Sequence, residues 1–197
     1  MKLIVLIAPS SAGKDYILNK VLNKIKEIKP IISYTTRPMR DMENGTEYNF
    51  VTKEKFDEMV LENKFIEVRS YNVSNGDIWF YGLPKDGLDL KSNYNYITIL
   101  DFEGYKVVKK YLEDLGQSDK LTSIYIDTNS KLRLLRSLSR ENDITDEKVR
   151  EIIRRFLADY NEVECAKDYV DYVMKNNNNT EAEAIILKIM EIIKKNN

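Results

Sequence analysis

The sequence predicts an α/β protein with a parallel core sheet that is covered by helices on both faces. Three continuous apolar runs, at residues 2–7, 96–101 and 121–126, have the length and composition of buried strands. Each run is followed by a stretch with apolar residues at helical spacing, and this alternation is typical of a parallel sheet. Such sheets bind ligands at the carboxyl ends of their strands, so the loops after these runs are the candidate sites.

The composition favours one domain and narrows the possible chemistry. The chain has 197 residues, of which 43% are hydrophobic, and 31 basic residues nearly balance 32 acidic ones. This balance predicts no global attraction to nucleic acid or membranes. No histidine is present, which excludes a histidine base and Ser-His or Cys-His pairs. The single cysteine, Cys165, excludes an intramolecular disulfide and is expected to fill the core. No apolar run reaches the ~18 residues that a membrane span needs. We therefore expect a cytoplasmic protein.

The first apolar run ends in a turn of small residues that leads Lys14 into a helix. Backbone N–H groups in such a turn can surround an anion, and the helix dipole and Lys14 add positive charge. The P-loop pattern has Gly where this chain has Ala8, and Ser or Thr where it has Asp15. Ala8 costs little if its φ is negative, and Asp15 can still reach Mg²⁺ directly or through water. A plain strand, turn and helix with a chance lysine is the alternative interpretation of this stretch alone.

The first helix is expected over residues 13–29, where Pro30 ends it, followed by a short strand at 31–33. Residues 34–40 then form an extended loop with Arg37 and Arg40. Arginine forks bind phosphate oxygens in pairs, although solvated surface arginines are the alternative interpretation.

The middle third interrupts the alternation of strands and helices and is predicted to form a separate lobe. Its expected features are a helix over 53–63 that Thr52 caps, a strand at 65–68, and a hairpin over 71–81 with a turn at Asn75-Gly76.

The last third returns to strands and helices. In the helix after residue 146, an apolar stripe is predicted from Val149, Ile152, Ile153, Phe156, Tyr160 and Val163. At 100° per residue Arg155 borders this stripe while Arg154 lies nearly opposite, so Arg155 is better placed for a cleft. Other expected features are helices over 103–115 and after Asp127, a polar interruption at 137–143, a strand at 169–174, and a terminal helix with a Thr180-x-x-Glu183 capping box.

Four segments occur in an order that resembles the guanylate kinase family of P-loop nucleoside monophosphate kinases. They are the turn at 8–15, Ser-Tyr-Thr-Thr-Arg-Pro-Met-Arg at 33–40, Gly-Thr-Glu-Tyr-Asn-Phe-Val at 45–51, and Phe-Ile-Glu at 65–67. The resemblance covers nearly the whole chain. It implies a single domain with a P-loop kinase three-layer fold, with the parallel core sheet at residues 1–32 and 92–197, an inserted small mixed α/β nucleotide-binding lobe at 33–91, and a helical lid at about 137–150. It also implies Mg²⁺-dependent phosphorylation of GMP or dGMP by ATP, in a monomer or homodimer that binds neither nucleic acid nor membrane.

The same resemblance implies roles for individual residues. ATP would contact Ser10, Ser11, Ala12, Gly13, Lys14, Asp15 and Asn176. GMP would contact Ser33, Arg37, Arg40, Tyr48, Glu67, Tyr81 and Glu103, with Glu67 at the guanine edge. Catalysis would depend on Lys14, Arg37, Arg140 and Arg155, with Arg154 as the alternative to Arg155. Magnesium would be served by Asp15 and Asp101.

One departure from the family pattern concerns the base. Leu83 stands where the family has a hydroxyl near guanine, and leucine cannot donate a hydrogen bond to guanine O6. Either Tyr81 or water supplies that bond, or the preference for guanine is looser. Two other interpretations therefore stay open: a kinase for another nucleoside or deoxynucleoside monophosphate, and a catalytically inactive binding module. Lys14, Arg37 and Arg40 favour the enzyme.

Overall fold

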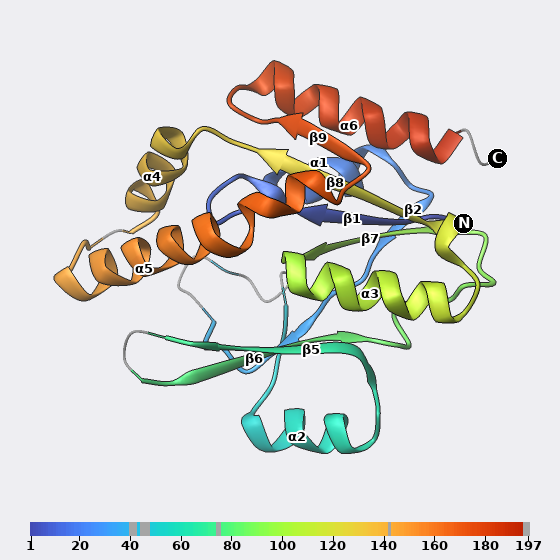
Figure 1. Ribbon diagram of the computed structural model, residues 1–197, viewed down its shortest axis with the longest axis horizontal. Coiled ribbons are helices and arrows are strands. Elements are labelled where there is room, and N and C mark those ends of the chain that lie inside the picture. Colours follow the sequence, from blue (N-terminus) through green and yellow to red (C-terminus); the bar gives the residue numbers. More distant parts are fainter. Residues whose placement is uncertain (40–42, 44–47, 74–75, 142, 195–197) are drawn as a thin grey trace.

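The computed structural model describes residues 1–39, 43, 48–73, 76–141 and 143–194, except the side chains of residues 161 and 162. Its core is a parallel five-stranded sheet, shown across the middle of Figure 1. The strand order is β2 (Ile28–Pro30), β7 (Asn95–Leu100), β1 (Leu3–Ile7), β8 (Leu121–Asp127) and β9 (Tyr172–Lys175). Neighbouring strands pair in parallel throughout, so the predicted α/β architecture is confirmed.

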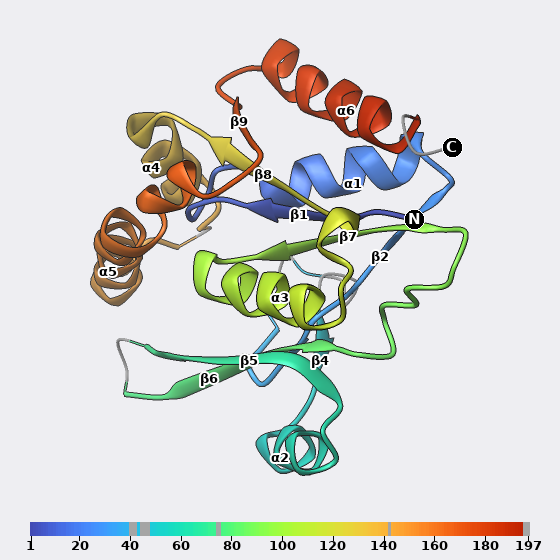
Figure 2. The ribbon, with the colours of Figure 1, turned by 45° about the vertical axis from the view of Figure 1, so that its right-hand side comes forward.

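Helices cover both faces of this sheet and complete three layers. All five residues of β1 are buried, and alternate side chains point to opposite faces. Ile4 and Leu6 pack in one cluster with α1 (Lys14–Lys24) and α6 (Asn179–Lys194). Leu3 and Val5 pack in a second cluster with α3 (Phe102–Asp114). Figure 2 shows α1 and α6 on one side of the sheet and α3 on the other.

The middle third forms the expected lobe, which lies below α3 in Figure 1. It contains a four-stranded mixed sheet and one helix. The sheet order is β4 (Asn49–Phe50), β3 (Tyr34–Thr35), β6 (Ile78–Pro84) and β5 (Phe65–Asn72), and the helix is α2 (Lys53–Leu61). The predicted cap is present, since Thr52 Oγ1 accepts a hydrogen bond of 3.2 Å from the Lys55 N–H. Strands β5 and β6 form the predicted hairpin, whereas Asn75 of the predicted turn lies outside the described residues.

Two helices, α4 (Ser130–Ser139) and α5 (Asp146–Glu162), follow β8. Both lie at the end of the molecule toward which the core strands run (Figure 1). The short 3-10 helices η1 (Ser118–Lys120) and η2 (Glu164–Asp168) precede β8 and β9. Among the helices of the described ranges, none is both long and apolar enough to cross a membrane.

The first helix is shorter than the sequence predicts. Helix α1 ends at Lys24, because Ile25 is already extended at φ −121° and ψ 108°. Residues 28–30 then pair with β7 as strand β2, three residues before the predicted strand at 31–33. A proline is tolerated in β2 because this strand is at the edge of the sheet, where one side of the backbone needs no partner.

The capping box predicted for α6 was wrong by two residues. Asn178 Oδ1 accepts a hydrogen bond of 2.9 Å from the Glu181 N–H, and the Glu181 carboxylate accepts one of 2.6 Å from the Asn177 N–H. Glu183 instead forms an ion pair with Lys24 of α1. The asparagine run thus starts the helix.

Two other predictions about buried residues were also wrong. Cys165 is exposed on η2 and does not fill the core. On α5, Ile153 is 52% exposed and Tyr160 is 76% exposed, so the predicted apolar stripe is not a buried face. Helix α5 packs against α4 and η2, and Asp159 on it also contacts the loop after β1, as described below.

Candidate active site

The loop between β1 and α1 has the backbone of an anion-binding turn. Ser11 and Gly13 have positive φ angles of 60° and 93°, whereas Ala8 does not, so the absence of glycine at position 8 causes no strain. Gly13 is required for a second reason. A Cβ at this position would lie 2.7 Å from Asn176 Nδ2. Lys14 follows as the first residue of α1, so the loop, the helix dipole and the lysine come together as predicted.

Side chains that follow two other core strands hold this loop. Thr128, after β8, donates a hydrogen bond of 3.0 Å to the Ala12 carbonyl, and Asn176, after β9, donates one of 2.8 Å to the same oxygen. Arg136 Nη1 of α4 lies 3.4 Å from it. The structure therefore places the Asn176 amide, predicted for ATP, against the loop backbone, where it is 3% exposed. Contact with a nucleotide stays a prediction.

Among the predicted lid arginines, the structure brings Arg140 to the loop. Its Nη2 contacts the Ser11 hydroxyl, which also lies 2.6 Å from the Ser137 hydroxyl. Arg154 and Arg155 both bond to Glu151 on their own helix. Burial acts to raise the pKa of Glu151, but its hydrogen bonds to the two arginines outweigh burial and lower the pKa to about 2. In this structure Arg155 thus pairs with an acid of its own helix α5, and its catalytic role stays a prediction.

Asp159 on α5 and Arg133 on α4 connect these helices to the same loop, and neither was predicted from the sequence. The Asp159 carboxylate accepts hydrogen bonds from the Ser10 N–H at 2.8 Å and from Arg133 Nη2 at 2.7 Å. Arg133 Nε donates to the Ser10 carbonyl at 3.0 Å. Burial raises the pKa of Asp159, and the Ser10 N–H and the charges of Arg133 and Lys14 oppose this rise. An acid on α5 and an arginine on α4 give no local sequence signal, because their partner is backbone far away in the chain.

In the lobe, Arg37 lies at the base of a hollow of about 460 Å³ beside Pro38 and Phe50. Its side chain is almost fully buried and donates two hydrogen bonds to Glu43, at 3.0 and 2.7 Å, and one to the Pro38 carbonyl at 2.7 Å. Burial acts to lower the pKa of Arg37, but the Glu43 carboxylate outweighs it and raises the pKa. In this structure the guanidinium is paired with Glu43, so its predicted contact with a phosphate stays a prediction. Arg40, its predicted neighbour, lies outside the described residues.

Tyr48 lies beside this cation, its ring centroid 5.5 Å from Arg37 Cζ, and begins a cluster of three tyrosines. The Tyr48 ring packs edge to face with Tyr81 at 5.7 Å, and Tyr71 packs against Tyr81 at 5.5 Å. Burial, and after it the negative charge of Asp15 on α1, together raise the pKa of Tyr48 to about 12. Tyr48 therefore keeps its proton at neutral pH and can donate a hydrogen bond. The effect of Asp15 also shows that the start of α1 and the lobe face each other within electrostatic reach.

The base-reading residue predicted from the sequence, Glu67, is 3% exposed on β5. Arg69 Nε and Nη2 donate to its two carboxylate oxygens at 2.7 and 3.1 Å. Arg69 also forms an ion pair with Asp101. The structure thus places Asp101, predicted for magnesium, on the same arginine as Glu67. It places Glu103, predicted for GMP, on the exposed face of α3 in an ion pair with Lys106.

Ser33 and Leu83 are both buried side chains. Ser33 is 6% exposed just before β3. Leu83 lies directly across from Glu67 in the β5–β6 register and is fully buried, in the cluster that joins the lobe to the core. Leu83 is thus adjacent to the predicted base site, and its side chain packs in the apolar cluster between the lobe and the core.

The donor atoms fit a magnesium ion that is bound mainly through substrate phosphates. Within the part of the chain that the structure describes, no group of three or more His, Cys, Asp or Glu residues could hold a metal. Asp15 is exposed in the first turn of α1, directly after Lys14. Mg²⁺ typically keeps several waters and uses one or two carboxylates beside phosphate oxygens, which a single Asp15 satisfies.

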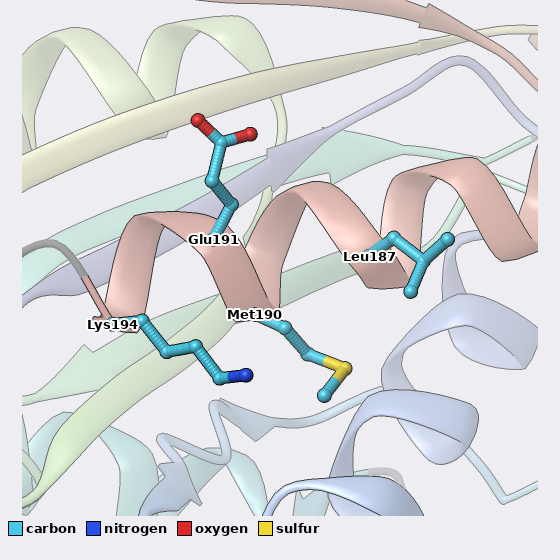
Figure 3. Close-up of a pocket in the computed structure, with 4 residues that line it drawn as sticks. All are labelled: Leu187, Met190, Glu191 and Lys194. Atoms are coloured by element: carbon cyan, nitrogen blue, oxygen red, sulfur yellow. The ribbon is translucent and has the colours of Figure 1, made fainter.

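A separate hollow of about 350 Å³ lies on α6 and has no connection with these residues. Leu187, Met190, Glu191 and Lys194 line it (Figure 3). Met190 and Lys194 point toward the same side of the helix, whereas Glu191 points away (Figure 3). These side chains form no polar cradle for a nucleotide, so the loop after β1 and the lobe remain the candidate site.

Known proteins resemble this chain over its whole length. A family model described as guanylate kinase matches residues 1–196. The guanylate kinase of Prochlorococcus marinus (strain MIT 9312) is 30% identical over 194 residues, covering 96% of this chain and 97% of that protein, and that of Wolbachia pipientis wMel is 32% identical over 182 residues, covering 88% and 81%. The crystal structure of guanylate kinase from Anaplasma phagocytophilum superposes with a TM-score of 0.66 at 22% identity, covering 99% of this chain and 85% of that one. The sequence, the fold and the site geometry agree that this chain belongs to the guanylate kinase family.

Proposed function

We propose that this chain transfers the γ-phosphoryl group of ATP to the phosphate of GMP or dGMP in a Mg²⁺-dependent reaction. One observation carries the proposal. The phosphate loop with Lys14 faces a lobe that contains the buried cation Arg37 and the hydroxyl donor Tyr48, and the charge of Asp15 acts directly on that tyrosine. Two phosphate-binding sites that face each other are the arrangement that phosphoryl transfer between two nucleotides requires.

The residues of this chain would act mainly by position and charge. Backbone N–H groups of residues 10–13 and the Lys14 ammonium would hold the ATP phosphates, while Arg37 and Tyr48 would hold the acceptor phosphate. Arg140 already contacts the loop and would neutralise charge on the transferring group. The acceptor phosphate, with a second pKa of ~6, is ionised at neutral pH, so the absence of histidine is no obstacle.

Asp15 would hold magnesium, directly or through water. When bound, the ion would supply positive charge that offsets the charge of the phosphates. The carboxylate has a second possible role at the helix start, where acids interact favourably with the dipole. Asp101 is less suited to the metal in this arrangement, because its carboxylate is engaged by Arg69.

The proposal is tested by ADP formation in the presence of ATP, Mg²⁺ and one monophosphate at a time, from GMP, dGMP, AMP, CMP and UMP. We expect GMP or dGMP to exceed AMP by at least ~100-fold in kcat/KM, because an acid that pairs with substrate N–H groups rejects a base that lacks them. Asp15→Asn should raise the Mg²⁺ concentration needed for half-maximal rate. If Asp15 serves only the helix start, this variant keeps wild-type magnesium dependence.

Other outcomes of the same assay favour the alternative functions. Comparable rates with AMP would indicate a kinase of broader base preference, consistent with the apolar Leu83 beside Glu67. No stimulation of ADP formation by any monophosphate, in folded protein that binds GMP, would indicate an inactive binding module.

We also propose a cellular location and an oligomeric state. We place the enzyme in the cytoplasm, acting on small nucleotides as a monomer or homodimer. A net charge of −1 supports the absence of a nucleic-acid or membrane partner. Sedimentation equilibrium of the purified chain distinguishes monomer from homodimer.

A further inference from the structure

Arg69 is a charged residue of the base site to which the sequence analysis assigned no role. Its guanidinium lies between Glu67 on its own strand and Asp101 at the start of α3. Nε and Nη2 donate to the two oxygens of Glu67 at 2.7 and 3.1 Å, and Nη1 donates to the Tyr71 hydroxyl at 3.2 Å. The Arg69 side chain is 14% exposed, and the Glu67 side chain is fully buried.

The structure is shaped around this guanidinium from both sides. A Cβ on Gly104, in the first turn of α3, would lie 2.9 Å from Arg69 Nε and 3.0 Å from its Cζ, so a side chain there would displace the guanidinium from this position. Asp101 caps the same helix by accepting a hydrogen bond of 2.8 Å from the Gly104 N–H. On the lobe side, Tyr81 lies directly across from Arg69 in the β5–β6 register. The position of Arg69 is therefore fixed by both the lobe and the core.

The charged groups around Glu67 decide whether it is ionised. Burial raises the pKa of Glu67, Arg69 lowers it through charge and hydrogen bonds, and the like charge of Asp101 raises it. The Tyr71 hydroxyl accepts a hydrogen bond from Arg69, and Tyr81 lies across from Arg69 on β6. Removal of the guanidinium would leave two acids close together in a buried site, and one of them would then bind a proton more readily.

The protonation state of Glu67 changes which base it can bind. An ionised carboxylate only accepts hydrogen bonds and has about four acceptor positions, of which Arg69 uses two. The other two match the adjacent N1–H and N2–H donors of guanine. A protonated carboxyl can instead donate to an acceptor, which is what adenine presents at N1.

We propose that Arg69 is a specificity-determining, positioning residue, which holds Glu67 ionised and oriented so that the site accepts guanine and rejects adenine. This inference rests on the proposed function, because it assumes that Glu67 faces the base of the acceptor nucleotide. It adds to that function a device by which one arginine, placed between two acids, sets the base preference.

The test compares variants that change the charge beside Glu67 in opposite directions. Arg69→Gln removes the cation. Asp101→Asn removes the like charge and keeps a side chain that caps helices equally well. Lys64→Gln is the matched control, because it removes a positive charge from an exposed side chain of the same lobe. For each protein, kcat/KM for GMP and for AMP is measured from pH 5 to 9, and thermal unfolding confirms the fold.

The informative quantity is the ratio of kcat/KM for GMP to that for AMP. This ratio cancels the ionisation of the acceptor phosphate, which both nucleotides share. In wild type it should fall as the pH drops through the pKa of Glu67. In Arg69→Gln the fall should begin at least about one pH unit higher, with a loss of selectivity of about tenfold or more at neutral pH. In Asp101→Asn it should begin at lower pH, and in Lys64→Gln it should not move.

A direct titration of the Glu67 carboxyl carbon by NMR, on the full chain without nucleotide, gives a readout independent of activity. We expect its midpoint to rise from Asp101→Asn to wild type to Arg69→Gln. If Arg69→Gln does not fold, Asp101→Asn still decides by the direction of its shift. An active wild type with the same ratio profile in both variants would overturn this inference alone, since a merely structural role lowers both activities equally at every pH. A wild type without GMP-dependent ADP formation would instead overturn the proposed function.

Discussion

Gly13 shows how one backbone position can depend on a distant side chain. Its φ of 93° favours glycine, and Asn176 Nδ2 occupies the space that a Cβ would need. Asn176 is held there by its hydrogen bond to the Ala12 carbonyl. The glycine, the amide and the loop thus form one unit, in which a change in any member displaces the others.

We therefore predict that Gly13→Ala destabilises the protein more than Gly116→Ala. Gly116 also has a positive φ, of 64°, but no atom lies within 4 Å of its absent Cβ. Gly116→Ala should lower the free energy of unfolding by about 1–2 kcal/mol, the cost of a left-handed residue with a side chain. Gly13→Ala should cost more and weaken ATP binding as well. Urea unfolding and ATP titration measure both effects, and equal costs for the two variants would contradict the role of Asn176.

Several site residues could be predicted from local sequence, and others could not. Lys14, Arg37 and Glu67 lie in compact segments whose order carries the signal, so the sequence alone could propose them, and their roles stay predictions. Arg133 and Asp159 were missed because their function here is to hold the Ser10 backbone, which no motif records. Glu103 was assigned through the resemblance to the family; the structure places it on the surface in an ion pair with Lys106, and its contact with GMP stays a prediction.

The start of α6 shows the same limit for a helix. The sequence offers two overlapping polar patterns, Asn178-x-x-Glu181 and Thr180-x-x-Glu183, and both resemble a capping box. The structure uses the first, because Glu183 is drawn to Lys24 on the neighbouring helix α1. The sequence alone could not distinguish these two candidate capping boxes, and the structure shows which of them starts the helix.

We predict that Asn178→Ala lowers the free energy of unfolding by about 1 kcal/mol, the usual cost of losing an N-cap side chain. Thr180→Ala, two residues later in the same turn, should cost clearly less. Urea unfolding of the two variants makes the comparison. A larger loss for Thr180→Ala would show that the helix begins two residues later than in this structure.

Over the whole molecule, buried acids give opposing contributions to the pH dependence of stability. The pKa of Glu151 is lowered to about 2, so its stabilising contribution is complete at neutral pH and is lost as the pH falls from its ordinary value toward 2. Burial raises the pKa of Asp159 and of Glu67. Their contribution to the free energy of unfolding therefore increases as the pH falls and the two carboxyls bind protons.

Glu151→Gln isolates the first contribution. At pH 7 we expect it to lower the free energy of unfolding by roughly 1–3 kcal/mol, since its arginine partners are partly exposed and solvent weakens the pairs. The difference from wild type should shrink steadily below about pH 4.5 and approach zero toward pH 2. Urea unfolding at several pH values measures it, and a difference that is constant with pH would mean that the glutamate acts by packing.

The fold as a whole was more predictable than its boundaries. The parallel core sheet and the inserted lobe follow from the apolar runs and from the break in their alternation. Element ends differed from prediction where strand pairing outweighed local signals, as at β2, where residues 28 and 29 of the predicted helix pair with β7 together with Pro30. The exposed stripe of α5 was beyond sequence reasoning, because an amphipathic helix does not reveal how much of its apolar face finds a partner.

The packing of Leu83 has a consequence for folding and motion. Leu83 and Ile66, at the inner ends of β6 and β5, belong to the same apolar cluster as Val108 of α3. The inner end of the lobe therefore cannot separate from the core without opening that cluster, and we expect both to melt in a single cooperative transition. Any movement of the lobe against the core must therefore leave this inner end, with Leu83 and Glu67 across from it, in place.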